Sequence, residues 1–214
     1  MTAPCPAEPS RDCPLCPRLV AFRLSARTAH PDWHNAPVPN FGPVSAPVLI
    51  VGLAPGMQGA NRTGRPFTGD WAGDLLYETL IDLGFATGVY DERPDDTLTL
   101  TRARIVNAVR CVPPENKPTG PEIATCRQFL AASLAEMQGL RAIVALGRIA
   151  HESLLRTLDL PVARYRFAHG ARHDLRPGLT LFDSYHCSRY NTNTGRLTPE
   201  MFRSVFAAVN SAIR

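Results

Sequence analysis

The sequence predicts an α/β fold: a single-domain α/β/α sandwich around a central, mainly parallel sheet of four strands. Short, continuous apolar runs alternate along the chain with longer segments in which apolar residues recur at helical spacing. Strands that alternate with helices pair in parallel, and the helices cover both faces of the sheet. The length of 214 residues suits one well-packed domain and is short for two.

The predicted strands are apolar runs that end in loops: residues 48–53, 104–110, 142–146 and 179–185. Helical spacing follows these runs over residues 70–83, over residues 120–137, after Gly147, and after Thr198. Thr198 is a typical N-cap residue, and the proline that follows it suits the first position of a helix.

The remaining segments carry turn-forming or polar residues. Residues 30–47 are rich in proline and residues 84–103 mix turn formers with charges, so we expect both to be irregular. Residues 1–12 are expected to form a disordered tail, and the folded domain is expected to cover residues 13–214.

The composition is that of an ordinary globular protein, with 44% hydrophobic and 20% charged residues. No segment approaches the ~20 apolar residues that span a bilayer, and the N-terminus lacks the apolar core of a signal peptide. We therefore expect a cytoplasmic protein with no membrane partner. The net charge of +4 permits a polyanionic partner.

The glycine-rich loop after the first predicted strand is the expected active site, because open α/β sheets bind ligands beyond the carboxyl ends of their strands. Glycines allow backbone N–H groups to come close to a ligand. The loop also carries Phe67, a flat apolar face, and Asp70, a carboxylate at the start of the next helix. Each residue has a structural alternative, since Phe67 could belong to the core and Asp70 could be a helix N-cap.

Four of the six cysteines are placed to share one metal centre: Cys13, Cys16, Cys111 and Cys126. Cysteines in this number in a cytosolic chain favour a metal over disulfides. The first two form a C-x2-C pair, whereas a C-x14-C spacing separates the other two. Zinc ribbons usually have two C-x2-C pairs, so this spacing favours a [4Fe–4S] cluster, with zinc as the alternative. Buried cysteines can also act as small hydrophobic residues.

Several longer motifs resemble those of one known family: GLAPGMQGANRTGRPFTGD, PPENKPT, VALGRIA, FAHGA and SYHCSRYNTNTGR, together with the four cysteines. They resemble the type b (family 5) uracil-DNA glycosylases, which are iron–sulfur members of the uracil-DNA glycosylase superfamily. The resemblance extends from Cys13 to the last predicted helix. It implies an enzyme, associated with the nucleoid of a prokaryote, that flips uracil and other deaminated bases such as hypoxanthine and xanthine out of DNA. Hydrolysis of the N-glycosidic bond would leave an abasic site for base excision repair.

The resemblance also implies roles for individual residues. Asp70 would activate water or stabilise the sugar cation, and His186 would donate a hydrogen bond to the developing uracil anion. Phe67 would stack on the flipped base, and Asn107 would read its Watson–Crick edge. Gly59, where stricter relatives carry a side chain that excludes thymine, would leave the pocket wall open or simply form a turn. Further substrate-binding positions are expected at Gly52, Ala54 and Gly56.

DNA binding is expected from loops at the same edge of the sheet. Residues 187–196 would form a wedge that enters the duplex, led by Arg189 and Tyr190. Basic side chains would bind phosphates, although a single exposed arginine is usually just solvated. The predicted DNA-binding residues are Arg62, Arg65, Lys117, Arg189, Tyr190, Asn191 and Arg196.

Two other functions are open to a chain with these motifs. A metal-cluster protein that binds nucleic acid without catalysis would keep the cysteines and basic loops but would not need Asp70 or His186. A nucleotide-handling enzyme could use the glycine-rich loop as a phosphate cradle, but the loop has neither a P-loop lysine nor a G-x-G-x-x-G pattern. Because no site lysine is placed to form a Schiff base, we expect a monofunctional glycosylase that acts as a monomer.

Overall fold

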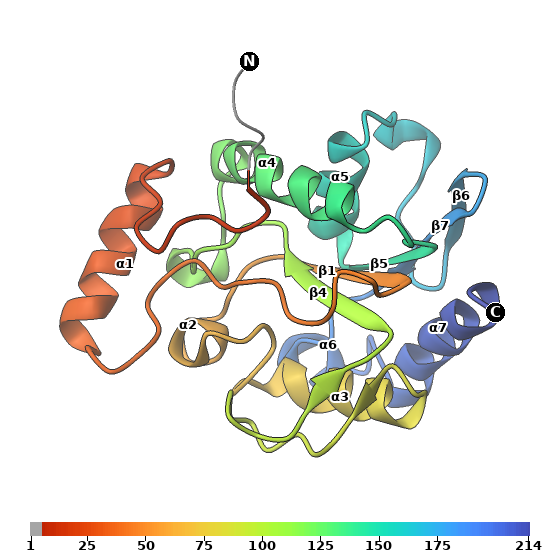
Figure 1. Cartoon of the computed structure of the whole chain (residues 1–214), viewed down its shortest axis with the longest axis horizontal. Helices are drawn as coiled ribbons and strands as arrows, with labels where there is room; N and C mark the ends of the chain where they lie inside the picture. The colour runs from red at the N-terminus through yellow and green to blue at the C-terminus, as the bar shows by residue number, and fades with distance from the viewer. Residues whose placement is uncertain (1–5) are drawn as a thin grey trace.

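Four buried parallel strands form the centre of the molecule in the computed structural model, which describes residues 6–214. These strands are β1 (Val48–Gly52), β4 (Ala103–Asn107), β5 (Ala142–Leu146) and β7 (Leu179–Ser184). Their order in the sheet is β4-β1-β5-β7, and helices lie above and below them (Figure 1). The predicted α/β sandwich is confirmed, and all four predicted strands are present.

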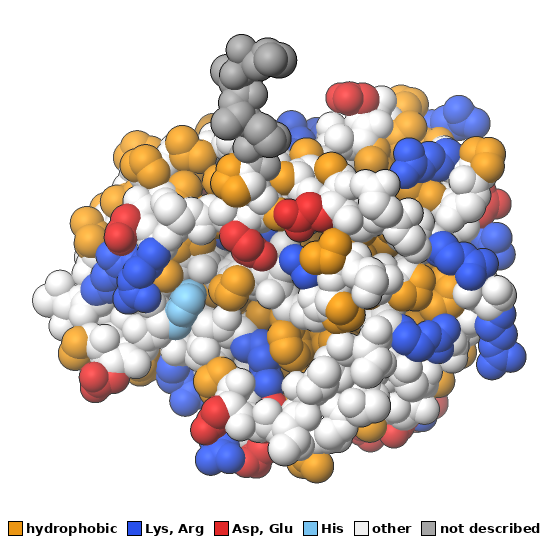
Figure 2. Space-filling model, viewed as in Figure 1, with side chains coloured by type: hydrophobic (Ala, Val, Ile, Leu, Met, Phe, Trp, Pro, Cys, Tyr) orange, Lys and Arg blue, Asp and Glu red, His pale blue; other side chains and the backbone are white. Residues whose placement is uncertain are grey.

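A fifth strand, β6 (Arg172–Arg176), pairs antiparallel with β7 at the edge of the sheet, so the prediction of four strands was one short. Its residues alternate between half-buried and exposed and are mostly charged, so the segment lacks the apolar run that marks a strand in sequence. Charged side chains suit an edge strand because they oppose pairing with another sheet. Figure 2 shows basic side chains gathered on this side of the molecule.

Two histidines and one carboxylate link the edge strand β6 to the rest of the domain. Asp183 of β7 is fully buried, and its two oxygens contact His151 Nδ1 at 2.7 Å and His173 Nε2 at 3.1 Å. His151 belongs to α5 (Arg148–Thr157), whereas His173 belongs to β6. Hydrogen bonds to both oxygens offset the cost of burying this carboxylate, so the cluster holds a helix and the edge strand together.

Alternate residues of the central strands face opposite helical layers. Val48 and Ile50 pack with α3 (Trp71–Asp82) and α7 (Pro199–Ala212). Leu49 and Val51 pack with α4 (Gly120–Glu136) and α5. A strand buried on both faces is apolar throughout, which is why these runs could be recognised. The other helices are α1 (Pro17–Ala29), α2 (Ala60–Thr63), α6 (Arg189–Asn193) and the single-turn 3₁₀ helices Pro114–Asn116 and Val162–Arg164.

The excursion predicted to be irregular contains a small two-stranded sheet, β2 (Ala86–Thr87) paired antiparallel with β3 (Thr99–Leu100). Between these strands, Asp96 forms a paired contact with Arg65, two hydrogen bonds of 2.7 Å each. The contact ties the excursion to the glycine-rich loop that precedes α3.

The start of the chain corrects the prediction of a disordered tail over residues 1–12. Residues 1–5 lie outside the described part, but residues 6–12 pack against the domain. Ala7 is buried, and its carbonyl accepts a hydrogen bond of 2.8 Å from the Arg110 side chain. Glu8 accepts one of 2.9 Å from the backbone of Asn40. Buried Arg110 needs acceptors, which the sequence alone did not reveal.

Among the helices of residues 6–214, none is long and apolar enough to cross a membrane.

Candidate active site

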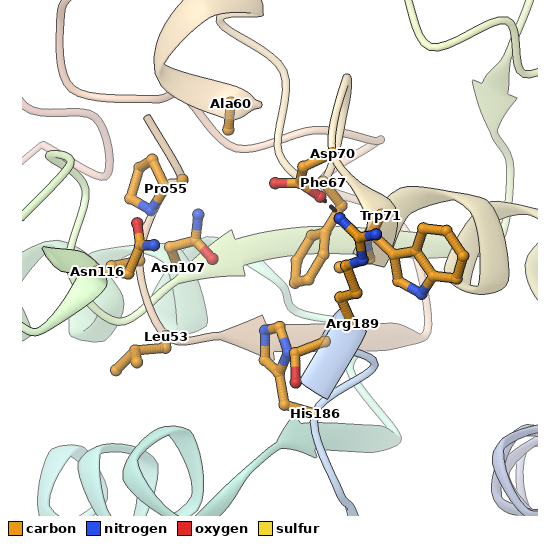
Figure 3. Close-up of a pocket in the computed structure, with 14 residues that line it drawn as sticks. Leu53, Pro55, Ala60, Phe67, Asp70, Trp71, Asn107, Asn116, His186 and Arg189 are labelled. Carbon is orange, nitrogen blue, oxygen red and sulfur yellow. Dashed lines mark hydrogen bonds between the residues drawn. The ribbon is translucent and has the colours of Figure 1, made fainter. Parts of the chain in front are cut away.

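A cavity of about 430 Å³ opens at the carboxyl ends of β1, β4 and β7 (Figure 3). It brings together residues from the glycine-rich loop, from the start of α3 and from the loops after β4 and β7. The lining residues are Leu53, Ala54, Pro55, Gly56, Ala60, Phe67, Asp70, Trp71, Ala72, Asn107, Asn116, His186, Ser188 and Arg189. Six of the eight predicted catalytic and substrate-binding residues therefore meet in one pocket, of a size that suits a small organic ligand.

Asp70 is both a helix N-cap and a pocket residue. Its side chain accepts a hydrogen bond of 3.2 Å from the Ala72 amide at the start of α3, while the carboxylate also lines the cavity. Burial raises the pKa of the Asp70 carboxyl above its usual range, against the amides of Ala72 and Gly73, which lower it. A desolvated carboxylate with a raised pKa suits a group that accepts a proton from water.

Gly59 lies behind Asp70 rather than among the residues that line the pocket, which corrects its expected place in the pocket wall. A Cβ at this position would lie 2.7 Å from Asp70 Cγ and 2.8 Å from Asp70 Cβ. Gly59 therefore makes room for the carboxylate.

Gly59→Ala is expected to slow the reaction at least 10-fold, because the added methyl group displaces Asp70 and misplacement by about 1 Å can cost 10²-fold. Single-turnover cleavage measures the effect. Gly120→Ala is the matched control, since a Cβ there meets nothing within 4 Å. In an Asp70→Ala background the Gly59→Ala change should add nothing. A wild-type rate for Gly59→Ala alone would show that this contact does not position Asp70.

Phe67 forms one wall of the cavity in a strained backbone conformation, with φ at +52°. Hydrogen bonds fix the turn around it: Tyr77 Oη donates to the Pro66 carbonyl and Tyr90 Oη donates to the Phe67 carbonyl. Phe67 is 7% exposed, and its ring centroid lies 5.8 Å from that of His186. The residue is thus mostly buried and still presents part of its ring to the pocket.

Gly52 supports the pocket from beneath and does not line it. A Cβ on Gly52 would lie 2.8 Å from Phe67 Cζ and would also collide with Asn107 Oδ1. The missing side chain therefore lets Phe67 and Asn107 approach each other. Asn107 Oδ1 is buried, and no group within residues 6–214 donates a hydrogen bond to it. Such an acceptor in a pocket suits a ligand with an N–H group.

His186 follows β7 and faces the same cavity. Burial lowers the pKa of His186 to about 4, so its imidazole is neutral at pH 7. A neutral imidazole carries one N–H and can donate one hydrogen bond to a ligand without bringing a positive charge.

The structure corrects the assignment of Arg65 to DNA. The Arg65 guanidinium is buried, pairs with Asp96 at 2.7 Å and lies 5.3–5.8 Å from three aromatic ring centroids. A phosphate cannot reach it without breaking this contact. Arg62 remains exposed, although its Nε donates to the Gln58 carbonyl at 2.7 Å. Lys117 is also exposed and pairs with exposed Glu115.

The predicted wedge contains the short helix α6, capped by Ser188. Tyr190 is 71% exposed, and Arg189 reaches the pocket. Asn191 was expected to contact DNA. In the structure its side-chain amide instead donates a hydrogen bond of 2.8 Å to the His186 carbonyl. It thus ties the wedge to the residue that enters the pocket. Arg196 is exposed and lies 4.5 Å from the Tyr185 ring centroid.

Three polar or aromatic pocket residues were missed from sequence: Trp71, Asn116 and Ser188. Asn116 lies in the PPENKPT motif and adopts φ of +58°, a conformation that asparagine tolerates better than most residues. Trp71 directly follows Asp70. Its position beside Asp70 in the sequence was the only signal that could have placed Trp71 in the pocket.

The four predicted metal ligands converge between α1, the loop after β4, and α4. Cys13, Cys16, Cys111 and Cys126 line one small cavity, and they are free thiols in the structure. Burial raises the pKa of Cys111 to about 11 and that of Cys126 to about 12, so thiolates there need a nearby cation. The Arg110 amide donates to Cys126 Sγ at 3.3 Å, as donors around metal-bound sulfur do. The donor set therefore fits a thiolate-bound metal.

Comparison with known proteins agrees with the motifs. A model of the uracil DNA glycosylase superfamily matches residues 39–210. The chain is 46% identical over 199 residues to the type-5 uracil-DNA glycosylase of Thermus thermophilus, with 90% of each chain covered. It is 38% identical over 198 residues to that of Pyrobaculum aerophilum, which covers 91% of this chain and 86% of the relative. It is 42% identical over 202 residues to that of Mycobacterium leprae, with 91% and 88% covered. The chain therefore belongs to the uracil-DNA glycosylase superfamily and, within it, to the type-5 uracil-DNA glycosylases.

Proposed function

We propose that this enzyme binds a uracil flipped out of DNA in the cavity beside Phe67, where Asp70 and His186 act on its N-glycosidic bond. The observation that carries the proposal is the convergence of Asp70, His186, Phe67 and Asn107 on one pocket. The sequence similarity to type-5 uracil-DNA glycosylases supports uracil in DNA as the substrate.

Two residues bind the base: the Phe67 ring and the side-chain oxygen of Asn107. The Phe67 ring stacks on the base, an interaction worth ~1–3 kcal/mol for base–aromatic stacking. Asn107 Oδ1, which accepts no hydrogen bond from residues 6–214, accepts the N3–H of uracil. Without a ligand this buried oxygen is unsatisfied, so an N–H at this position is favoured over a methyl or a lone pair.

Bond cleavage requires stabilisation of two opposite charges. The base leaves as an anion, and the neutral His186 imidazole donates its one N–H to the uracil O2 as negative charge develops there. The sugar develops positive charge, which the Asp70 carboxylate opposes. Asp70 also takes the proton of the attacking water, helped by its raised pKa.

The reaction stops at an abasic site. A glycosylase that also cuts the strand uses an amine to form a Schiff base with the sugar. Lys117 is the sole lysine of the sequence, and it lies outside the pocket lining, paired with Glu115. The enzyme is therefore monofunctional, and it acts as a monomer on DNA in the cytoplasm.

The four cysteines hold a structural [4Fe–4S] cluster. The four cysteines line one small cavity, and the C-x14-C spacing of Cys111 and Cys126 differs from the two C-x2-C pairs usual in zinc ribbons, which supports the cluster over the zinc alternative. When bound, the cluster would cross-link the segment before α1 to the sheet and α4.

Labelled duplexes with one uracil, hypoxanthine, xanthine or thymine, each opposite every normal base and assayed in EDTA, test the proposal. Alkali-dependent breaks at uracil and at the other deaminated bases, with none before alkali, are expected. Cutting at uracil alone would show that Asn107 restricts the pocket to one base. DNA binding with no cutting at any base would contradict the proposed function.

A further inference from the structure

Trp71 is a large aromatic residue exposed at the mouth of the pocket. It follows Asp70 at the start of α3 and lines the cavity, yet it is 50% exposed. Figure 3 shows the indole beyond Arg189, at the end of the pocket opposite Leu53 and Asn107. Tryptophan is highly buried on average, so half exposure at the edge of a ligand site needs an explanation.

The exposed indole is held in a fixed orientation. Its Nε1–H donates a hydrogen bond of 2.9 Å to Thr192 Oγ1 in α6. The Arg189 guanidinium lies 5.5 Å from the ring centroid, which is a cation–π distance. Both contacts come from α6, the helix of the predicted wedge. The ring is thus fixed in place although much of its surface faces solvent.

The surroundings of the indole suit a nucleic acid. Arg189 lines this rim together with Trp71, and the next residue of α6, Tyr190, is 71% exposed. Aromatic faces beside arginines are the usual platform for unpaired bases, because every base offers a π-face and the arginine attracts its phosphate. Flipping a nucleotide removes the stacking partner of the base next to it.

We propose that Trp71 stacks on the nucleobase next to the flipped nucleotide in the damaged strand. This inference rests on the proposed function, since the flipped nucleotide occupies the cavity that begins at Asp70. Trp71 is a DNA-binding residue in this account, and it touches none of the reacting atoms. The competing explanation is that Trp71 only fastens α6 to α3 through Thr192.

Fluorescence tests the stacking directly. Trp33, the other tryptophan of the sequence, stacks on His30, and Trp33→Phe leaves Trp71 as the sole source of tryptophan emission. This variant is titrated with a duplex that carries one tetrahydrofuran abasic analogue and with an undamaged duplex of the same sequence. Strong quenching of Trp71 by the abasic duplex, beyond that by the undamaged one, is expected. Unchanged emission at saturation, established by anisotropy of labelled DNA, would overturn the proposal.

Three substitutions distinguish stacking of Trp71 on DNA from a purely structural contact of Trp71 with α6. Trp71→Ala is expected to raise the Kd for the abasic duplex about 5- to 150-fold, whereas Trp71→Phe keeps most of the affinity. Thr192→Val, which removes the acceptor of the indole N–H together with the bonds of that hydroxyl to the Ser188 and Arg189 carbonyls, should bind within about 3-fold of wild type by the same scale. Equal losses in all three variants would show that Trp71 acts by fastening α6. Uracil excision by the wild-type enzyme in the same preparation is the separate check: its failure would remove the proposed function and this inference together.

Discussion

Asp70→Asn is expected to slow uracil excision ~10²–10⁴-fold in single-turnover experiments, the usual contribution of a positioned acid or base. Asparagine has nearly the same shape and is an equally good N-cap, so the hydrogen bond from Ala72 and the start of α3 should be retained. Removing a carboxylate whose charged form is penalised by burial should not lower the Tm. The loss should therefore fall on the rate and not on folding or DNA binding.

Asp74→Asn is the matched control for this change. Asp74 lies one turn further along α3, is exposed, and is absent from the pocket lining. Its variant should cleave at a rate close to that of wild type, and both variants should bind a uracil duplex with the wild-type Kd. A normal cleavage rate in Asp70→Asn, or a larger loss in Asp74→Asn, would assign the catalytic carboxylate elsewhere.

Replacing Cys13 or Cys111 with serine is expected to remove the bound metal and most of the soluble protein. The apolar contacts around these cysteines are few: Leu19, Val109, Cys126 and Phe129 make up the buried part of this cluster. So small a core stabilises α1 weakly without a cross-link. A structural metal contributes its binding free energy to folding, and its loss should unfold this part of the chain.

Iron and zinc content, soluble yield and Tm measure that effect. The wild-type enzyme should contain about four irons per chain, as a [4Fe–4S] cluster requires. Cys187→Ala is the control, because Cys187 is buried in the main core and not in the cluster of the four predicted metal ligands, and it should leave the iron content unchanged. One zinc per chain in place of iron would replace the cluster assignment. A Cys111→Ser variant that folds normally but is inactive would show that the centre is not structural.

The strands could be predicted where burial alone determines the sequence. The residues of β1 and β5 are buried on both faces, so their side chains are apolar and form continuous runs. β4 is buried in the same way and keeps an apolar centre at Ile105 and Val106. β6 is half exposed, and its position depends on His173 reaching Asp183, a contact between distant segments. No local pattern could reveal that contact.

The site shows the same division between local and long-range information. Asp70, Phe67, Asn107 and His186 could be placed together, because the carboxyl ends of parallel strands share one edge of the sheet. Arg65 could not be excluded from DNA binding, since its partner Asp96 lies in the excursion whose path the sequence did not predict.

The pH dependence of single-turnover excision, measured on prebound duplex, tests the role of Asp70 most directly. Asp70 acts as a carboxylate, and burial raises its pKa, so the rate should fall as the pH drops through a value above the usual ~3.9 of aspartate. The slower Asp70→Asn reaction should lack this acid limb and stay flat until the protonation of His186 near pH 4. An acid limb of the same pKa in both enzymes would contradict the assignment of Asp70 as the group that activates water.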